Sequence, residues 1–321
     1  MLDFPQPPKS YKSVFLEETD KVLPEKIDPR TRYAFFSTIA SGGKSLIKSC
    51  KDLHLSRFVC YKTLKPEFAN DEIEQQRLIR EARVSAMLQH PNTVPTYELG
   101  RDGRGYPYFT MKLVHGYTLR EILDYRDRYD LTQLMDLVLQ VGYALEYAHT
   151  HGVAHRDIKP ENILAGPYGE VVLLDWGLAK VWHPDGTALA EEEPAPAAIK
   201  DLSLTGQGKA QGTAHYMSPE QIQLDPNIDF RTDIFSLGAV LYEILCGVPP
   251  AVGEKMHEVI ASVLNDTPDL PSARCNQHVP VLLESVAMKC LQKDPTQRFQ
   301  SMEEVLMLLQ QNWRSDLVSI R

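Results

Sequence analysis

The segment that most constrains the fold is "TDIFSLGAVLYEILCG", residues Thr232 to Gly247. Its apolar side chains occupy nearly the whole circumference of the helix that the spacing predicts. A helix at the surface of a globular protein is apolar along one stripe only, so a helix that is apolar all round must be buried. The chain therefore needs a helical body large enough to enclose this segment.

The chain before this helical body has a different pattern. From Tyr33 to about Val114, aromatic and β-branched residues form short strand-like runs between turn signals. "DGRG", Asp102 to Gly105, predicts the hairpin turn between the last two of these runs. The runs are "YAFFSTIA", "RFVCYKTL", "NTVPTYELG" and "YPYFTMKLV".

Three further helices are expected from capping and spacing signals. One runs from Asp71 to Gln89 within the strand-rich part, with Asn70 as its cap and acidic residues in its first turn. A second begins at a Thr132 cap and stops at Gly152. Ser301 and Glu304 suggest a capping box for a last helix that ends near Trp313.

We therefore predict an α+β fold with a small β-rich lobe at residues 33–114 and a larger helical lobe at residues 115–313. Residues 1–32 are rich in Pro and charge, which predicts a flexible extension, and residues 314–321 are expected to form a tail. The acid-, Ala- and Pro-rich stretch at residues 188–200 predicts a mobile loop within the helical lobe.

Charge, cysteine content and apolar runs exclude several classes of function. The net charge of −9 argues against nucleic acid or an anionic membrane as a partner, because both require a basic surface. The five cysteines are odd in number and contain no C-x-x-C pair, which indicates reduced thiols and no zinc site. No apolar run reaches the roughly 18 residues of a membrane span, and the N-terminus lacks a signal-peptide pattern. A cytoplasmic protein without a membrane span is predicted.

Two adjoining segments carry the residues suited to chemistry. "HRDIKPEN" contains a carboxylate at Asp157, a cation at Lys159 and an amide at Asn162, and Pro160 prevents an ordinary helix interior. "VVLLDWGLAK" is an apolar strand that ends by presenting Asp175 before a glycine. If the two strand ends converge, they bring together a base, a cation and two oxygen ligands of the kind that Mg²⁺ prefers.

These segments resemble the signature of the eukaryotic-type protein kinases, and the sequences of the motifs are most similar to those of the bacterial serine/threonine (Hanks-type) kinases of that superfamily. The resemblance runs from about Tyr33 to Trp313 and includes five motifs in the family's order. It implies a two-lobed kinase fold and transfer of the γ-phosphate of ATP to protein Ser or Thr hydroxyls, with Mg²⁺, or alternatively Mn²⁺, as the metal. The large aromatic of "DWG", where the family has D-F-G, is expected to pack without binding a ligand.

The resemblance implies a role for each matching residue. Lys62 of "FVCYK" would contact the α- and β-phosphates, and Glu81, 19 residues later, would pair with it. Asp157 would accept or orient the proton of the substrate hydroxyl, and Lys159 would neutralise the transferring phosphoryl group. Metal ions would be held by Asn162 and Asp175. Met111 would be the gatekeeper residue, and the backbone of the hinge residues Lys112 and Val114 would bind the adenine edge.

An activation segment is expected at residues 175–220, because "GTAHYMSPEQ", Gly212 to Gln221, resembles the end of that segment in the family. Thr213 would contact Asp157 and Lys159 and favour Ser or Thr acceptors. Thr205, eight residues earlier, would be autophosphorylated and its phosphate would pair with Arg156; an unmodified loop hydroxyl is the alternative reading of Thr205. The structural residues implied are Glu220 paired with Arg298, and Asp233 bound to the backbone of the HRD loop.

The nucleotide loop departs from the family's G-x-G-x-x-G-x-V pattern. The nine residues Ile39, Ala40, Ser41, Gly42, Gly43, Lys44, Ser45, Leu46 and Ile47 align with it without gaps, and Lys62 follows at the expected distance. Ala40 and Ser45 replace the first and third glycines, which predicts a stiffer, weaker ATP-binding loop.

Two alternatives remain open from the sequence. A pseudokinase that binds nucleotide or a partner protein without catalysis is motivated by Ala40 and Ser45 and opposed by the intact Lys62, Asp157 and Asp175. A small-molecule phosphotransferase is opposed by "GTAHYMSPE", because that segment provides a platform for protein substrates. Protein substrates and ATP are the partners implied, together with a transient homodimer for trans-autophosphorylation.

Overall fold

The computed structural model describes residues 31–182 and 213–311. Clustering of the described residues separates two compact units, one containing residues 31–89 and 93–116 and the other residues 90–92, 117–182 and 213–311. A β-rich unit followed by a larger, mainly helical unit confirms the predicted α+β fold class. The finer limits of 33–114 and 115–313 stay predictions.

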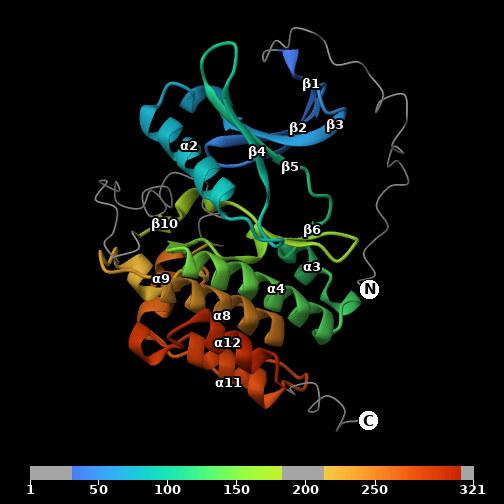
Figure 1. Cartoon of the computed structure of the whole chain (residues 1–321). Helices are drawn as coiled ribbons and strands as arrows, with labels where there is room; N and C mark the ends of the chain where they lie inside the picture. Colours follow the sequence, from blue (N-terminus) through green and yellow to red (C-terminus); the bar gives the residue numbers. More distant parts are fainter. Residues whose placement is uncertain (1–30, 183–212, 312–321) are drawn as a thin grey trace. The chain divides into compact units, whose positions relative to one another are not determined.

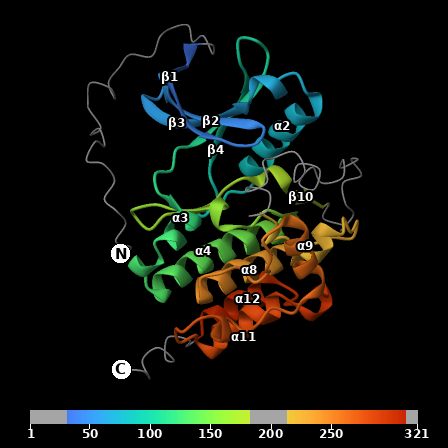
Figure 2. The same cartoon turned by 180° about the vertical axis from the view of Figure 1, so that it is seen from behind.

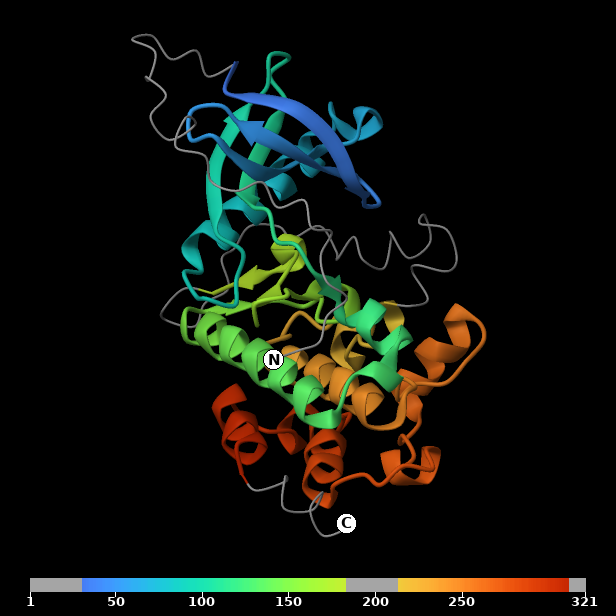
Figure 3. The ribbon, with the colours of Figure 1, turned by 90° about the vertical axis from the view of Figure 1, so that its right-hand side faces the viewer.

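The first unit is a five-stranded antiparallel sheet with strand order β1-β2-β3-β5-β4 and one long helix, α2, packed against one face. Figure 1 shows α2 alongside the sheet, and Figure 3 shows the twist of the strands. The elements are β1 Tyr33–Ser41, β2 Ser45–Asp52, β3 Arg57–Leu64, η2 Pro66–Phe68, α2 Glu72–Met87, β4 Thr96–Arg101 and β5 Pro107–Lys112.

Alternation along β3 distributes its side chains between two small cores. Leu64 joins Phe109 of β5 and Leu78 and Ala82 of α2 in the core between sheet and helix. Residues of opposite parity face the other side, where Val59 and Tyr61 pack with Cys50 and Tyr108. This period of two places Lys62 on the helix side of the sheet.

The second unit is built mainly from helices, which Figure 2 shows from behind. The long helix α8 packs against α4 and α11, and α12 packs against α4 and α11. The elements are β6 Tyr117–Thr118, α3 Leu119–Asp124, η3 Arg126–Arg128, α4 Leu131–Thr150, β7 Val153–Ala154, η4 Pro160–Asn162, β8 Ile163–Ala165, β9 Val171–Leu173, η5 Trp176–Leu178, β10 Lys180–Val181, α7 Pro219–Ile222, α8 Arg231–Cys246, α9 Met256–Asn265, α10 Pro271–Arg274, α11 Val281–Cys290, η6 Pro295–Gln297 and α12 Met302–Leu309.

The all-apolar helix is buried as predicted, because every residue of α8 from Thr232 to Cys246 is buried. Its fully enclosed side chains, such as Ile234 and Ile244, each contribute about 1.5–3 kcal/mol of hydrophobic stabilisation. Gly238 permits the close approach of α11, since a Cβ at that position would lie 2.3 Å from Cβ of Cys290. The apolar pattern of Thr232 to Gly247 predicted that other helices surround this segment, and α4 and α11 pack against it.

Two of the three predicted helix caps were wrong. Asp71 caps α2 by accepting hydrogen bonds from the backbone N–H groups of Ile73 and Glu74, whereas the Asn70 side chain accepts from the Tyr106 hydroxyl. Asp130, with a reciprocal capping box to Gln133, begins α4 in place of Thr132. Both errors have one cause: two polar residues compete for one cap, and the backbone path decides between them.

The last helix begins as predicted but ends earlier. Ser301 accepts a hydrogen bond from the backbone N–H of Glu304, while the Glu304 carboxylate accepts from the backbone of Gln300, so the reciprocal half of the box is absent. The helix ends at Leu309 and not near Trp313. The strand β4 likewise starts at Thr96, four residues later than its predicted run, because Pro95 cannot donate to a ladder.

Several predictions concern residues outside the described ranges. They are the extension at residues 1–32 except for its last two residues, the acidic stretch at 188–200, Thr205 and the tail at residues 314–321. Within residues 31–182 and 213–311, no helix combines the length and apolarity needed to cross a membrane. All five cysteines lie in the described ranges as free thiols, as predicted.

Candidate active site

The loop between β7 and β8 folds back so that three of the predicted side chains meet. Lys159 Nζ donates to both carboxylate oxygens of Asp157, at 2.8 Å each. Asn162 Nδ2 donates to the backbone oxygen of Asp157 at 2.8 Å and to its Oδ2 at 2.9 Å. Pro160 starts the short 3₁₀ turn that brings Asn162 back to Asp157. We call Asp157, Lys159 and Asn162 the transfer cluster.

Burial shapes the acidity of this cluster. The Asp157 side chain is only 11% exposed, and burial raises the pKa of its carboxyl above the usual range; the Asp175 carboxylate adds to the rise and the Lys159 ammonium opposes both. Burial alone would lower the pKa of Lys159, but the nearby Asp157 carboxylate more than compensates and raises it. The cluster therefore holds a carboxylate of increased basicity next to a charged ammonium group.

Asp233 of α8 supports the loop from within the core. Its two carboxylate oxygens accept the backbone N–H groups of His155 and Arg156, at 2.8 Å each, and Oδ2 also lies 2.9 Å from His149 Nε2. Burial opposes ionisation of Asp233, yet these hydrogen bonds hold its pKa below the usual value. The predicted contact between Asp233 and the loop backbone is present, and Arg156 adopts the left-handed φ of 66° there.

His155 connects the transfer cluster to the segment that carries Asp175. It is fully buried, its Nε2 lies 2.9 Å from the backbone oxygen of Leu174, and its Nδ1 accepts the backbone N–H of Asp157 at 3.1 Å. Desolvation lowers its pKa, so the ring is neutral at physiological pH. Trp176 of the "DWG" sequence is buried with its ring centroid 4.5 Å from that of His155, so this aromatic packs, as expected.

Asp175 and Asn162 lie at adjacent strand ends. β8 and β9 are antiparallel with Ile163 opposite Leu173, and the N–H of Leu174 donates to the backbone oxygen of Asn162 at 2.8 Å. Asp175 has a left-handed φ of 63° and is exposed; its Oδ1 accepts the N–H of Gly177 at 3.3 Å. This local turn directs the carboxylate away from the ladder.

The chemistry of these two side chains fits a hard divalent cation. The Asn162 amide binds Asp157 through Nδ2, so its oxygen is the atom that would meet a cation, and Asp175 would supply a carboxylate. In the described part of the chain, no group of three or more His, Cys, Asp or Glu side chains could hold a metal ion by itself. Mg²⁺ typically binds through one or two carboxylates together with substrate phosphates and does not require such a cage.

In the first unit, β3 and α2 bring Lys62 and Glu81 together. Lys62 Nζ donates to Glu81 Oε1 at 2.5 Å, and both residues are buried. Next to them, the Cys60 thiol has its pKa raised to about 12 by burial, so it is unreactive at neutral pH. A buried ammonium–carboxylate pair is stable only with close geometry, which this one has.

The nine residues of the predicted nucleotide loop form a tight hairpin. Ile39 to Ser41 belong to β1 and Ser45 to Ile47 belong to β2, so only residues 42–44 make the turn, closed by a 3.0 Å bond from Gly42 N–H to the Ser45 backbone oxygen. A Cβ on Gly42 would lie 3.1 Å from Ser45 Oγ, which is tighter than usual. A side chain at the middle glycine would therefore require the Ser45 hydroxyl to shift.

The predicted gatekeeper and hinge residues follow one another at the end of β5. Met111 packs onto the core between sheet and α2. Lys112 is paired with Val59 of β3, and its backbone N–H donates to the Pro95 oxygen at 3.0 Å. Val114 comes two residues after the strand ends. Their assignment to the adenine edge stays a prediction.

Of the predicted activation-segment residues, Thr213 lies against the transfer cluster. Lys159 Nζ donates to Thr213 Oγ1 at 3.3 Å, while Arg156 donates through Nε to the Leu178 oxygen at 2.7 Å. Gln221 Nε2 donates to the backbone oxygen of Arg156 at 2.7 Å. The segment after Thr213 is thus attached to the loop that carries Asp157.

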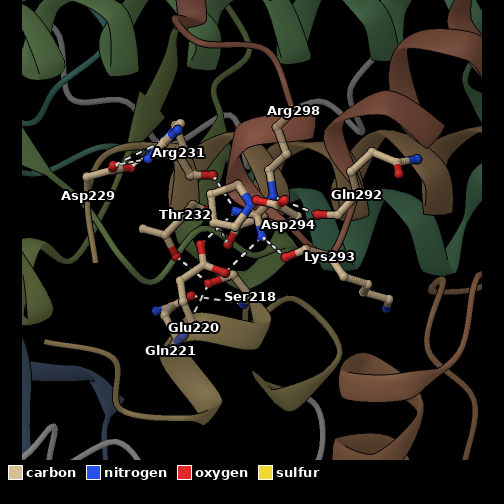
Figure 4. Close-up of polar contacts among 12 residues, drawn as sticks. Ser218, Glu220, Gln221, Asp229, Arg231, Thr232, Gln292, Lys293, Asp294 and Arg298 are labelled. Atoms are coloured by element: carbon tan, nitrogen blue, oxygen red, sulfur yellow. Dashed lines mark hydrogen bonds and ion pairs between the residues drawn. The ribbon is translucent and has the colours of Figure 1, made fainter. Parts of the chain in front are cut away.

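Arg298 and Glu220 form the predicted ion pair, shown in Figure 4. The Arg298 guanidinium is 2% exposed and binds both carboxylate oxygens of Glu220, at 2.6 and 2.8 Å. Its remaining N–H groups donate to three backbone oxygens, those of Gln292, Lys293 and Arg231. All five donors are used, which is the condition for burying a guanidinium at tolerable cost.

Sequence reasoning missed three supporting residues. His149 binds Asp233, Gln221 binds the backbone of the loop that carries Asp157, and Arg120 binds both oxygens of the buried Glu243 at 2.8 and 2.9 Å. The available signals were His149 and Glu243, which lie within otherwise apolar helical segments. A buried polar side chain requires a hydrogen-bond partner, so each of them indicated that a partner exists. Their partners lie far away in sequence, so the pattern alone does not identify them.

Comparison with known proteins agrees with this geometry. The family model described as the protein kinase domain matches residues 33–313. The serine/threonine-protein kinase PknB of Mycobacterium leprae is 33% identical over 292 residues, which cover 90% of this chain and 43% of that protein. A probable serine/threonine-protein kinase of Clostridium acetobutylicum is 32% identical over 275 residues, covering 86% and 39% of the two chains.

A probable serine/threonine-protein kinase of Streptomyces coelicolor is 33% identical over 277 residues, covering 85% of this chain and 39% of the relative. The chain spans about two-fifths of the length of these curated relatives. Because the family model matches residues 33–313, which is most of the chain, this chain belongs to the protein kinase family.

Proposed function

We propose that this chain is a serine/threonine protein kinase that transfers the γ-phosphate of ATP to hydroxyl groups of protein substrates. Membership of the family implies the use of ATP and a divalent cation. The observation that carries the proposal is the transfer cluster, in which Lys159 and Asn162 both bind the carboxylate of a largely buried Asp157. A pseudokinase has no need to maintain this arrangement.

In the proposed reaction, the Ser or Thr oxygen of the substrate forms a bond to the γ-phosphorus while the bond from that phosphorus to the bridging oxygen of ADP breaks. The hydroxyl proton passes to an Asp157 oxygen, whose raised pKa favours that acceptance. Lys159, 2.8 Å from Asp157, offsets negative charge on the transferred group. Phosphoryl transfer requires positioning and charge stabilisation, and these residues supply both.

Mg²⁺ is the cation that the oxygen donors favour, with Mn²⁺ as the alternative, and it would neutralise phosphate charge when bound. Asn162 would present its amide oxygen, since its nitrogen is bonded to Asp157. Asp175 would present its carboxylate from the turn that follows β9. The identity of the metal and these ligand roles are part of the proposal.

The first unit is proposed to bind the nucleotide. Lys62, oriented by Glu81, would contact the α- and β-phosphates, and the β1–β2 hairpin would cover the phosphates with backbone atoms around Gly42. The backbone after Met111, at Lys112 and Val114, would bind the adenine edge. These roles follow from the family's pattern and from the buried Lys62–Glu81 pair.

Protein Ser and Thr hydroxyls are the proposed acceptors because Thr213 contacts Lys159 beside Asp157. The names of the relatives, all serine/threonine-protein kinases, support the same class. Autophosphorylation of Thr205, in trans within a transient homodimer, is proposed as the control of activity, with Arg156 as the partner of the phosphate. A cytoplasmic site of action and a signalling role complete the proposal.

Phosphosite mapping tests this function directly. Purified, phosphatase-treated protein is incubated with Mg-ATP and a generic protein acceptor, beside Asp157→Asn and the exposed control Glu303→Gln, and phosphopeptides are identified by mass spectrometry. We expect phosphate on Thr205 or its neighbours and on the acceptor with the parent chain and Glu303→Gln, and at least about 10²-fold slower labelling with Asp157→Asn.

The opposite result has a defined meaning. Absence of phosphate from both the protein and the acceptor, with ATP binding retained, would replace the kinase proposal by the nucleotide-binding pseudokinase. Ala40 and Ser45, which replace two glycines of the hairpin, would then be the first positions to restore. Phosphate transfer at the parent rate by Asp157→Asn would remove Asp157 from its proposed role.

A further inference from the structure

Helix α2 carries two buried carboxylates, and the proposed function uses only one of them. Glu74 and Glu81 are seven residues apart, which is two helical turns, so they lie on the same side of the helix about 10 Å apart. Both residues are 8% exposed. Glu81 binds Lys62, which leaves the burial of Glu74 in the first turn of the helix to be explained.

Glu74 binds a lysine from the turn of the nucleotide hairpin. Lys44 Nζ lies 2.9 Å from Glu74 Oε1, and the Lys44 side chain is 24% exposed. The backbone of Lys44 is also fixed, because its oxygen accepts the N–H of Lys65 at 2.9 Å. The turn is thus attached both to α2, through the side chain, and to the end of β3, through the main chain.

A second cation shares the same carboxylate. Arg77 Nη1 lies 2.5 Å from Glu74 Oε1, one turn along the helix. Two cations on one carboxylate make Glu74 a stable anchor, because the carboxylate keeps a partner whenever one of them moves. The side chains of Lys44 and Glu74 are partly buried, so the pair is screened less by water and salt than a surface pair.

We propose that Lys44 is a positioning residue that ties the phosphate-covering turn to α2, so that the turn and the Lys62–Glu81 pair are set by the same helix. This rests on the proposed function, since it assumes that the hairpin covers the nucleotide phosphates. With Ala40 and Ser45 in place of two glycines, the backbone of the hairpin is less adaptable, and a side-chain tie holds it where the phosphates bind. Lys44 acts through Glu74 and does not itself bind the nucleotide.

Nucleotide affinity in a double-mutant cycle tests this tie. Equilibrium dissociation constants for Mg-ADP and KM and kcat for ATP are measured for the parent, Lys44→Met, Glu74→Gln and the double variant. We expect each single change to weaken Mg-ADP binding and raise KM by about 3- to 10-fold, with kcat changed less than twofold. The double variant should be no weaker than either single variant, because both remove the same tie.

Two further variants make the result specific. Lys44→Arg keeps the cation and should restore affinity to within about twofold of the parent. Lys48→Met is the matched control: Lys48 lies on the same hairpin, but its Nζ is 5.8 Å from the ring of Phe36 and it is paired with Tyr61, on the opposite face of the sheet. We expect no change in affinity there.

Two kinds of outcome overturn the proposal, and a third separates it from the kinase function. If Lys44→Met weakens binding while Glu74→Gln leaves it unchanged or strengthens it, Lys44 contacts the phosphates directly and the tie is not its function. If no variant changes affinity, or the parent binds no nucleotide, Lys44 positions nothing. A parent that binds Mg-ADP through a coupled Lys44 and Glu74 but transfers no phosphate would leave the inference intact and overturn the kinase function alone.

Discussion

In the second unit, Asp157 lies on a loop whose backbone is bound from beneath by the buried Asp233, whereas in the first unit the turn at Gly42 and Gly43 is exposed. The loop is also held by its own His155, whose ring lies 2.9 Å from the Leu174 oxygen, and by the Gln221 amide, which donates to the Arg156 oxygen. The hairpin turn is bonded to the chain just after β3 through the Lys44 backbone and to α2 through the Lys44–Glu74 ion pair. The loop that carries Asp157 is therefore anchored in the core, whereas the turn is anchored through Lys44, whose side chain is partly exposed.

Two aspartates within the second unit, the buried Asp233 and the largely buried Asp157, sharpen the comparison. Burial opposes ionisation of Asp233, but its carboxylate is bonded by the His149 ring and by two backbone N–H groups, and these hydrogen bonds lower its pKa. Asp157 is buried beside another carboxylate, and its pKa is raised although Lys159 opposes the rise. A carboxyl whose environment disfavours its charge is typical of a functional group, and one whose environment stabilises its charge is typical of a structural group. The following predictions test this distinction.

The largest expected effect is the loss of transfer activity in Asp157→Asn. Removing the proton acceptor should lower kcat by about 10²- to 10⁴-fold, while Asn keeps the shape of the side chain and leaves the buried Lys159 one oxygen to bind. KM for ATP should change little, and the melting temperature should stay within a few degrees of the parent. Steady-state kinetics and thermal unfolding measure both; a variant that retains activity, or one that unfolds, would break the assignment.

Asp233→Asn should instead act on stability. Asn offers one acceptor oxygen to two backbone N–H donors and turns its own N–H₂ toward one of them, so a buried donor is left unpaired. We expect a loss of about 3–5 kcal/mol in the free energy of unfolding, measured by denaturant titration. Asp229→Asn is the control, because Asp229 is 31% exposed where it pairs with Arg231, so the change should cost under about 1 kcal/mol. Equal losses would show that burial at Asp233 is not the cause.

The pH dependence should separate the two aspartates by sign. The raised pKa of Asp157 means that transfer activity falls with decreasing pH well before the usual carboxyl range near roughly pH 4, because the carboxylate is the form that accepts the proton. Its contribution to folding stability is present at low pH and is lost as pH rises through the raised pKa. Asp233 has a lowered pKa, so its contribution is present above the unfolded-state pKa and is lost as pH falls through the folded-state pKa.

Rates and unfolding free energies across the pH range measure these effects. We expect the acid limb of the kcat profile to disappear from the residual activity of Asp157→Asn, since that variant has no carboxyl to titrate there. An acid limb that is identical in the parent and in Asp157→Asn would assign the titration to another group.

Where a residue pattern is fixed by local geometry, the sequence predicted the fold closely. β3 has the predicted limits Arg57–Leu64, the "DGRG" turn closes with a bond from Gly105 N–H to Asp102 oxygen, and α8 is buried as the apolar pattern required. In these cases burial, propensity and turn chemistry agree. The predictions for α2 and α4 missed the capping residues, and α2 ends at Met87, two residues before the predicted Gln89. Asp130 with Gln133 is a capping-box pattern that could have been recognised.

What the sequence could not predict depends on partners far apart in the chain. Nothing near His149 indicates that its ring meets Asp233, 84 residues later, and nothing near Arg120 indicates Glu243, 123 residues later. Lys44 was predicted only as one position of a nucleotide loop, and its bond to Glu74 follows from how the hairpin and α2 pack. The period of the apolar residues predicts helices and strands, whereas the polar side chains that pair across the core are identified only by the three-dimensional structure.

The smallest expected effect concerns the two glycines missing from the hairpin. Restoring them with Ala40→Gly and Ser45→Gly should tighten Mg-ADP binding by about two- to threefold, because a more adaptable backbone can approach the phosphates more closely. Both positions lie in strands, where Ala40 is opposite Ile47 and Ser45 is opposite Leu64, so each glycine should also cost about 0.5–1 kcal/mol of stability.

Calorimetric titration and thermal unfolding of the two single variants and the double variant measure both quantities, with Gly42→Ala as the opposing control. A Cβ at Gly42 would lie 3.1 Å from Ser45 Oγ, so this change should weaken binding, and Ser45→Gly should relieve it by removing that oxygen. If the glycine variants bind nucleotide no better or more weakly, the stiffness of the hairpin is an advantage. The Lys44–Glu74 pair and the strand residues would then already hold the hairpin in its binding conformation. The difference in rigidity between the hairpin and the transfer cluster would be smaller than the exposure of the turn suggests.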